Sequence, residues 1–456
     1  MARHKFNYGF VYVTNYSHKF RELIQNIAER SEQVIPSKSL KGIGIFLFGS
    51  PSRQEMIDES DADIMIIREK DNKDYFIFRK EFIGLLEKEN FEKIDIPDWG
   101  SYEECELYIK NSITEGNQVA ELKFVYGDPA VNSYIETLKN KYCTKERFEK
   151  VLCFQKLYFD QYYTQRTKPG VKNVKYGHGG TRDFMFLTWF VNVLDTADGR
   201  KINTEDNFPL VHKSLSSLYE RGLINFGDYK RYLESINVIL ILRSEILIQN
   251  RWTSEAGLTY LDDKAINLLL KRKVFREDSI NDEASLKMYL EKHIKEVAEL
   301  KQKIWELFLS YLHISRGSNW VNQFKNFLAG NITPSDIDLI EEHDELMQMA
   351  VIWNINIEKD SSLFNHIFDK YSKSDKWTIL ASLCCNTQCS DKVLSDIVQK
   401  GCSKGYEYLL RITSRNKNVS KETLRKIINQ PNLEHRYKIV AKIAYEKGVE
   451  KANDLR

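Results

Sequence analysis

No stretch of the sequence is apolar for long enough to cross a membrane. A transmembrane helix needs roughly 18 to 20 consecutive apolar residues, and no run in this chain approaches that length. The opening residues, MARHKFNYGFVYV, also lack an apolar core of the length found in secretory signals. These absences predict a cytoplasmic protein with no membrane partner.

An excess of charge of one sign is also lacking. The chain has 67 Lys and Arg against 65 Asp and Glu, a net charge of +2. This balance argues against a general nucleic-acid binder, although it leaves room for a local basic patch. With 456 residues, of which 42% are hydrophobic and 29% charged, the chain is expected to form two or three globular domains.

Cysteine is too sparse for a disulfide framework in a chain of this length, because there are only seven. Cys385 and Cys389 lie close enough in sequence to suggest a pair of metal ligands, but no histidine lies nearby to complete a site. We therefore expect these residues to be buried thiols.

The most informative stretch, GIFLFGSPSRQEMIDESDADIMII, predicts a strand, a turn and a second strand. Residues 43–48 and 62–67 are short apolar runs rich in β-formers, and a Gly-Ser-Pro sequence ends the first run. Asp61 and Asp63 are two residues apart, so an extended backbone places both carboxylates on one face. Two hard oxygen ligands so close together suit Mg²⁺.

Gly49 and Ser50 add the features of a phosphate site. A glycine at a strand end lets the backbone approach a phosphate closely, and amides in a tight turn form an anion-binding concavity. The Ser50 hydroxyl and the Arg53 guanidinium add donors for phosphate oxygens. A Gly-Ser or an Asp-x-Asp alone is usually a turn or a solvated edge. The two together, flanked by apolar β-runs, favour a nucleotide site.

The segment GSPSRQEMIDESDADIMI resembles the signature of the polymerase-β-type nucleotidyltransferases, and especially the PII uridylyltransferase of nitrogen control and the glutamine synthetase adenylyltransferase. Arg53, Glu55 and Ser60-Asp61-x-Asp63 fall where those families carry Arg, Glu and Ser-Asp-x-Asp. The uridylyltransferases typically have Gly-Gly where this chain has Gly-Ser. The resemblance implies a domain that binds a nucleoside triphosphate together with two Mg²⁺ ions.

A third carboxylate enters on the strand that follows the next helix in this fold class. Residues 75–89 have helical spacing, and residues 91–96 form a β-like run that contains Asp95 and stops at Pro97. Asp95 is therefore predicted as the third metal ligand or general base, with Asp98 in the following turn as the alternative. Three carboxylates are needed to hold two ions about 3.5 to 4 Å apart around an in-line displacement at phosphorus.

Two later stretches resemble further motifs of the same families. AELKFVYGDPAVNSYIETL, expected to form two helices interrupted at Gly-Asp-Pro within a helical segment 101–145, is similar to the Glu-Ala-Arg-Leu-Leu-x-Gly-Asp-Pro of the uridylyltransferases. NVKYGHGGTRDFMFLTW is similar to Asn-x-Lys-x-Gly-Pro-Gly-Gly-x-Arg-Asp, with His178 in place of the proline. A glycine-rich loop before a helix can bind an anion, here with Lys175 and Arg182 as phosphate partners, although such loops are more often only turns.

The segments beyond this loop are long and amphipathic, which predicts a helical bundle. Within it, Leu-Arg-Ser-Glu at 242–245 resembles the Leu-Arg-x-x-Glu of the adenylyltransferase bundle, and we expect Arg243 and Glu245 to form a structural ion pair.

The tail changes character at about Trp320. The pattern Asn-x-x-x-Ser precedes an apolar helix at Asn386 and again at Asn416, a spacing of 416 minus 386, or 30 residues, and a looser copy begins at Asn354. Such periods indicate stacked helical repeats, which resemble the leucine-rich-repeat-variant arrays and usually bind protein. An ordinary helical domain is the alternative.

The predicted fold is α+β, with a polymerase-β-like nucleotidyltransferase domain in residues 1–145, a helical bundle in 146–315 and a C-terminal helical repeat domain in 316–456. The expected reaction moves UMP or AMP from a nucleoside triphosphate to a hydroxyl acceptor, expected on a protein, with release of pyrophosphate. The predicted metal ligands and catalytic residues are Asp61, Asp63 and Asp95, and the predicted nucleotide-binding residues are Gly49, Ser50, Arg53, Lys175 and Arg182.

Two alternative functions stay open. One is a catalytically weak nucleotide-binding module that acts through protein interactions of its repeats, and the other is transfer to a small-molecule acceptor. Nucleic acid is not an expected partner.

Overall fold

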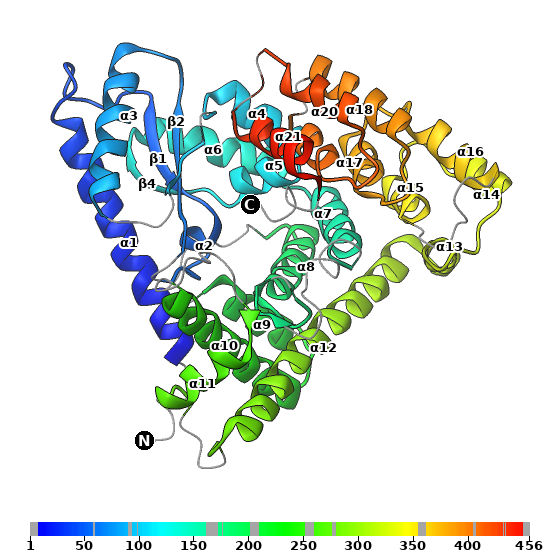
Figure 1. The fold of residues 1–456 in the computed structure, drawn as a ribbon, viewed down its shortest axis with the longest axis horizontal. Coiled ribbons are helices and arrows are strands. Elements are labelled where there is room, and N and C mark those ends of the chain that lie inside the picture. The colour runs from blue at the N-terminus through cyan, green and yellow to red at the C-terminus, as the bar shows by residue number, and fades with distance from the viewer. Residues whose placement is uncertain are drawn as a thin grey trace. The chain divides into compact units, whose positions relative to one another are not determined.

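The computed structural model describes residues 8–57, 60–89, 94–97, 99–160, 172–175, 177–200, 209–250, 260–275, 280–353, 362–404, 407–431, 433 and 435–449. These residues are mostly helical and include two small sheets (Figure 1), which confirms the α+β class. Asp98 and Asn354 lie outside the described residues.

The chain divides into two units. The first comprises Met1–Ile109, Asn117–Phe148 and Thr167–Leu307, and the second comprises Lys110–Gly116, Glu149–Arg166 and Phe308–Arg456. The boundary predicted at 145/146 falls inside the first unit, and the one predicted at 315/316 falls near the division at 307/308.

The first unit contains a mixed sheet with the strand order β3-β2-β1-β4. β1 (Ile43–Leu47) and β2 (Ala62–Arg68) form the predicted antiparallel pair. Helix α3 (Lys73–Leu86) then leads to β3 (Ile94–Asp95), which lies parallel to β2. The predicted order of strand, turn, strand, helix and strand is confirmed.

The expectation of helix throughout residues 101–145 is wrong at its centre. Between α5 (Thr114–Ala120) and α6 (Pro129–Tyr142), the sequence Lys-Phe-Val-Tyr-Gly forms β4 (Lys123–Gly127), which pairs antiparallel with β1. β-branched and aromatic residues favour a strand, and the free edge of β1 provides partners for its backbone. The Phe124 ring packs against Phe46, with their centroids 5.4 Å apart. Helix α4 (Tyr102–Asn111) precedes α5.

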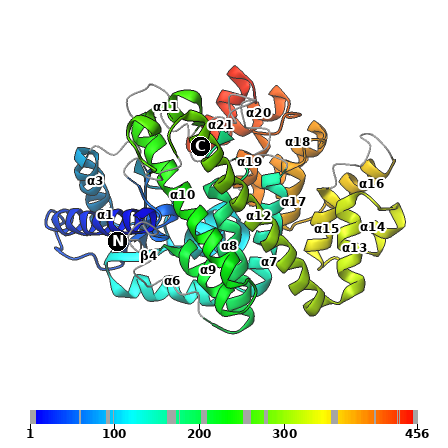
Figure 2. The same cartoon turned by 90° about the horizontal axis from the view of Figure 1, so that it is seen from below.

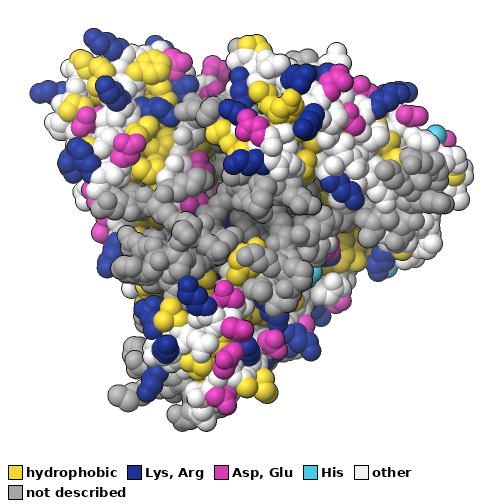
Figure 3. All heavy atoms as spheres, viewed as in Figure 1, with side chains coloured by type: hydrophobic (Ala, Val, Ile, Leu, Met, Phe, Trp, Pro, Cys, Tyr) yellow, Lys and Arg dark blue, Asp and Glu magenta, His cyan; other side chains and the backbone are white. Residues whose placement is uncertain are grey.

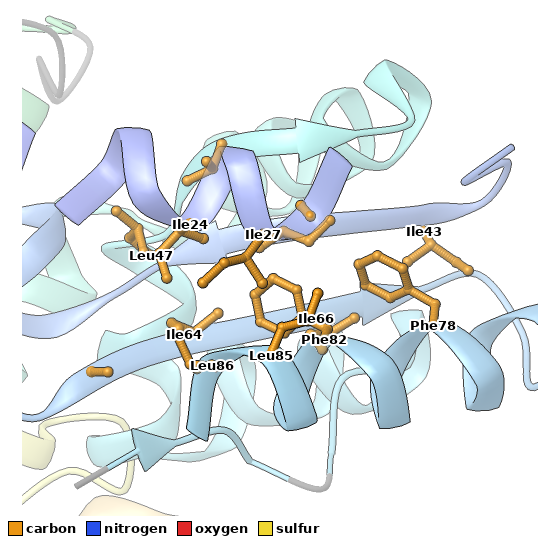
Figure 4. Packing of buried hydrophobic residues seen from close by; sticks show 14 of the residues in the cluster. Ile24, Ile27, Ile43, Leu47, Ile64, Ile66, Phe78, Phe82, Leu85 and Leu86 are labelled. Atoms are coloured by element: carbon orange, nitrogen blue, oxygen red, sulfur yellow. The ribbon is translucent and has the colours of Figure 1, made fainter. Parts of the chain in front are cut away.

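Alternation along the strands separates the core from the opposite face of the sheet. Residues 43, 45 and 47 of β1 and residues 62, 64 and 66 of β2 belong to one buried cluster with α1 (Tyr8–Glu32) and α3. Figure 4 shows side chains from both helices, such as Ile27 and Phe82, packed among those from the strands. Because successive side chains alternate, Asp63 projects from the other face.

The predicted helical bundle is also present in the first unit. The expected helices correspond to α9 (Leu210–Glu220), α10 (Phe226–Asn250) and α12 (Glu283–Arg316), the last of which crosses the division between the units. Helix α8 (Phe184–Ala197) packs on α9, and α10 packs on α1. Glu245 forms its ion pair with Arg272, which follows α11 (Asp263–Lys271), with 2.9 Å between N and O. Residues two apart on a helix do not face each other, so Arg243 is not its partner.

The second unit carries stacked helices with a recurring asparagine. α15 (Glu345–Ile352), α17 (Trp377–Cys385), α19 (Glu407–Thr413) and α21 (His435–Lys447) pack in this order, as Figure 2 shows. The Asn416 side-chain amide donates to the carbonyls of Cys384 and Asn386, both at 2.8 Å, and Asn386 donates in the same way to Ile352. Each asparagine therefore ties its repeat to the preceding one.

The remaining helices of this unit alternate with those just described or precede them. They are α13 (Ser318–Ala329), α14 (Pro334–Leu339), α16 (Ser362–Tyr371), α18 (Asp391–Lys404) and α20 (Lys421–Ile428). The expected thiols are free, and burial raises the pKa of Cys385 and of Cys389 well above its usual range.

Within the described part of the chain, no helix combines the length and the apolar character needed to cross a bilayer. Figure 3 shows basic and acidic side chains interspersed on the face in view, in keeping with the near balance of charge in the sequence.

Asp128 ties α6 to the start of β1. Its Oδ1 accepts the Ala130 N–H at 2.8 Å, which caps the helix, and its Oδ2 accepts the Gly42 N–H at 2.7 Å. These two bonds lower the pKa of Asp128. The Gly-Asp-Pro sequence thus has a structural role.

Replacing Asp128 with Ala is expected to lower the free energy of unfolding by about 1 to 2 kcal/mol at neutral pH, because a helix cap is lost. A carboxylate with a lowered pKa stabilises the fold above its unfolded pKa, and this contribution disappears as the pH falls through its folded pKa. Urea unfolding should therefore show the wild type and Asp128→Ala converging in acid. The exposed change Ser133→Ala in the same helix is the control. A difference that does not depend on pH would contradict this account.

Candidate functional site

The three predicted carboxylates meet at the β2–β3 edge of the sheet. Asp63 of β2 pairs in parallel register with Asp95 of β3, and residues aligned in this way on neighbouring strands point to the same face. Asp61 comes just before β2, two residues from Asp63, and shares that face. All three are partly exposed on the side away from the core of α1 and α3.

Asp63 carries the strongest electrostatic signature of this group. Burial, followed by the charges of Asp95 and Asp61, raises the pKa of Asp63 to about 7, while Arg53 and Lys175 oppose the rise. Near neutral pH, a negative charge on this carboxylate is therefore poorly compensated by the protein.

Gly49 lies directly over the Asp63 carboxylate. Its φ is +62°, and a Cβ added there would lie 2.4 Å from Oδ2 of Asp63, too close for any larger residue. The predicted turn forms one helical turn, α2 (Gly49–Ser52), attached to β2 by a bond from the Phe48 N–H to the Asp63 carbonyl at 3.3 Å. Among the described residues outside α2, no backbone carbonyl accepts the N–H of Gly49 or Ser50, and no N-cap side chain does so.

Arg53 lies in the same segment, but its guanidinium contacts carboxylates. Nε donates to Glu55 at 3.0 Å, and Nη1 donates to Glu121, just before β4, at 2.5 Å. Burial acts to lower the pKa of Arg53, but the two carboxylates raise it above its usual value. Glu121 is absent from the sequence-based prediction. Its only signal is its place in the resemblance, since it occupies the position of the first Glu in the motif that ends in Gly-Asp-Pro.

The glycine-rich loop between β5 (Lys172–Asn173) and α8 uses its backbone amides internally. The N–H groups of Gly177 and Gly180 donate to carbonyls within the loop, and that of Gly179 donates to the Asp183 carboxylate at 2.8 Å. The next three N–H groups, of residues 181–183, also donate to carbonyls of the loop. These N–H groups therefore already have acceptors, and phosphate binding by Lys175 and Arg182 stays a prediction.

The same loop carries Lys175. The charge of Lys175 acts to lower the pKa of Asp63, which indicates that this side chain is directed toward the carboxylates. The Arg182 Nη1 donates to the Met185 sulfur at 3.0 Å.

A buried ion pair anchors this loop to α12. Lys301 Nζ lies 3.3 Å from Oδ1 of Asp183, and both side chains are almost fully buried. Burial raises the pKa of Asp183, although Lys301 opposes the rise. Gly179 packs against the Ile294 carbonyl of α12 so closely that an added Cβ would clash.

The carboxylates at this face are of the chemical type that binds Mg²⁺, although the described residues form no ready-made metal cage. No group of three or more His, Cys, Asp or Glu residues in the described part of the chain is arranged tightly enough to hold an ion by itself. The site nevertheless gathers five carboxylates around two cations, and carboxylate oxygens are the hard ligands that Mg²⁺ prefers. The carboxylates are Asp61, Asp63, Asp95, Glu55 and Glu121, and the cations are Arg53 and Lys175.

No family model matches this chain, and a search of curated proteins found no match. The resemblance to nucleotidyltransferases therefore rests on the sequence motifs.

We expect Asp63→Asn to stabilise the metal-free protein, because it removes a poorly compensated negative charge close to two others. In EDTA, the melting temperature should rise by about 2 to 4 °C, which corresponds to about 1 kcal/mol in a domain of this size. Mg²⁺ should raise the melting temperature of the wild type but not that of the variant. Glu89→Gln, a change at an exposed carboxylate of the same unit, is the control. A loss of stability of Asp63→Asn in EDTA would contradict the electrostatic account.

Proposed function

We propose that this chain is a Mg²⁺-dependent nucleotidyltransferase that moves a nucleoside monophosphate from a nucleoside triphosphate to a hydroxyl acceptor and releases pyrophosphate. One observation carries the proposal. Asp63 and Asp95 are paired on neighbouring strands, with Asp61 on the same face and a glycine at the end of β1 packed against Asp63. This arrangement places a set of carboxylates suited to metal beside a glycine at a strand end, where the backbone can approach a phosphate closely.

The residues have separate roles in this reaction. Mg²⁺ bound at the site would link the triphosphate to the carboxylates and stabilise charge at the reacting phosphorus. Asp61 and Asp63 hold metal, and Asp95 completes the set or takes the proton of the acceptor hydroxyl. The N–H groups of Gly49 and Ser50 receive the outer phosphates, and Lys175 offsets their charge. Most of the rate enhancement then comes from positioning and electrostatics.

The nucleotide and the acceptor follow from the resemblance. UMP and AMP are the groups transferred by the two families whose motifs the chain resembles, and their acceptors are proteins, often through tyrosine. We therefore propose a protein hydroxyl as the acceptor. The helical repeats offer a surface on which a protein target could be held.

The direct test incubates the purified protein with each of the four α-labelled nucleoside triphosphates, Mg²⁺ and host-cell lysate. The proposal predicts label on a single protein band, with one nucleotide preferred, and no label with Asp61→Ala/Asp63→Ala. Label on a small molecule alone would replace the protein acceptor by a soluble one. Full activity of the double variant would remove the metal assignment.

A second candidate function is supported by the asparagine-linked repeats of the second unit. In this alternative, the first unit binds a nucleotide without turning it over, and the repeats carry the function by binding a protein. Binding of Mg²⁺ and a nucleoside triphosphate without pyrophosphate release, with any acceptor, would favour this alternative.

Gly49→Ala should strongly reduce transfer by disturbing the site itself. The added methyl group would lie against Oδ2 of Asp63, and alanine at a φ of +62° is strained, so we expect turnover to fall by about 100-fold or more. Gly84→Ala in α3 is the matched control, because a Cβ there meets no atom within 4 Å, and alanine favours helix. Comparable activity in both variants would contradict the placement of the phosphates at Gly49.

A further inference from the structure

Arg53 makes four hydrogen bonds to the surrounding structure. Its side chain donates to Glu55 and Glu121, its backbone N–H donates to the Gly49 carbonyl at 3.2 Å, and its carbonyl accepts the Leu210 N–H of α9 at 2.9 Å. The residue therefore connects the segment that begins at Gly49 with both the chain before β4 and the helical bundle.

The side chains of this cluster are largely shielded from water. Their exposed fractions are 12% for Arg53, 11% for Glu55 and 19% for Glu121. A guanidinium that bridges two carboxylates in such surroundings has its charge already satisfied, and breaking the bridge would leave two carboxylates facing each other without a cation. A triphosphate that bound Arg53 would have to offset the free energy lost when this bridge breaks.

Lys175 belongs to a glycine-rich loop whose backbone N–H groups donate within the loop and to the Asp183 carboxylate. A lysine provides a mobile point charge suited to phosphate, whereas the planar fork of an arginine suits the bridging of two carboxylates.

We infer that Arg53 is a positioning residue and not a nucleotide ligand, and that Glu121 is its partner. The bridge from Arg53 to Glu55 and Glu121 fixes the Gly49–Ser50 turn against Asp63 and so sets the geometry of the metal ligands. This inference rests on the proposed function for the identity of the ligand.

The experiment uses Arg53→Met/Glu121→Gln, which removes one positive and one negative charge and so leaves the net charge of the cluster unchanged. At saturating Mg²⁺, the dissociation constant of the magnesium–nucleoside triphosphate complex should change by less than about threefold, while the Mg²⁺ concentration for half-saturation should rise about fivefold or more. Lys175→Met should weaken nucleotide binding by about tenfold or more, the effect of losing one charge-assisted hydrogen bond. Titration calorimetry measures all of these quantities.

Two outcomes would overturn the inference. Nucleotide binding that is about tenfold weaker in Arg53→Met/Glu121→Gln would make Arg53 a ligand, and no change in either quantity would leave it a purely structural residue. If the double variant fails to fold, the single variant Glu121→Gln replaces it in these measurements. If Arg53 bound the nucleotide, Glu121→Gln would free it from a competing carboxylate and tighten nucleotide binding about tenfold. If Arg53 is a positioning residue, Glu121→Gln should weaken Mg²⁺ binding without that gain.

These measurements separate the inference from the proposed function. If the wild type binds the nucleotide with Mg²⁺ but transfers nothing, only the proposed function fails, because both binding constants are still measured. If the wild type binds no nucleoside triphosphate, both fail.

Thermal stability gives an independent check on the bridge. Arg53→Met leaves Glu55 and Glu121 facing each other without their cation, so adding Glu121→Gln should raise the melting temperature of that variant. A further decrease would show that Glu121 is not the partner of Arg53.

Discussion

Negative charge gathered on one face of a small sheet is the constraint on which the rest of this structure depends. Pairing of β2 with β3 places Asp95 beside Asp63, and burial together with these neighbours raises the pKa of Asp63 to about 7. Carboxylates brought this close repel one another, so holding them together lowers the stability of the fold. A function that uses cations at this face accounts for that cost, whereas a purely structural role does not.

The opposite face of the same sheet provides the rigidity that the arrangement needs. Alternate residues of β1 and β2 are buried with α1 and α3, which fixes the register and so the face on which Asp63 projects. Close contacts around the site also restrict its movement. Gly49 packs against Asp63, Gly179 packs against α12, and the Lys301–Asp183 pair fastens the loop that carries Lys175. Each of these positions admits little movement or extra volume, so the site is built by packing as much as by its charged groups.

Much of this arrangement could be predicted from local patterns. Short apolar runs rich in β-formers mark β1 and β2, the Asp-x-Asp spacing gives a shared face, and the helix after β2 leads to the strand that carries Asp95. β4 was not predicted, because a run of five residues after a helix is too short for its periodicity to distinguish a strand from a helix. The bond between Arg53 and Glu121 joins residues 68 positions apart, and no spacing within one sequence specifies such a pair. The role of the glycine-rich loop could not be predicted for a related reason, since its composition permits an anion cradle but only the hydrogen bonds of the folded loop tell which of its amides already have acceptors.

The central claim is that Asp61, Asp63 and Asp95 together hold the metal used in nucleotidyl transfer, and locating the metal tests it most directly. Crystals of the protein grown with Mn²⁺ and a non-hydrolysable nucleoside triphosphate would give anomalous difference peaks at the bound ions. The account predicts at least one peak within about 2.2 Å of oxygens from Asp61 and Asp63, with Asp95 adjacent and the outer phosphates at Gly49 and Ser50. Manganese and nucleotide bound elsewhere, with these three carboxylates free of metal, would contradict it.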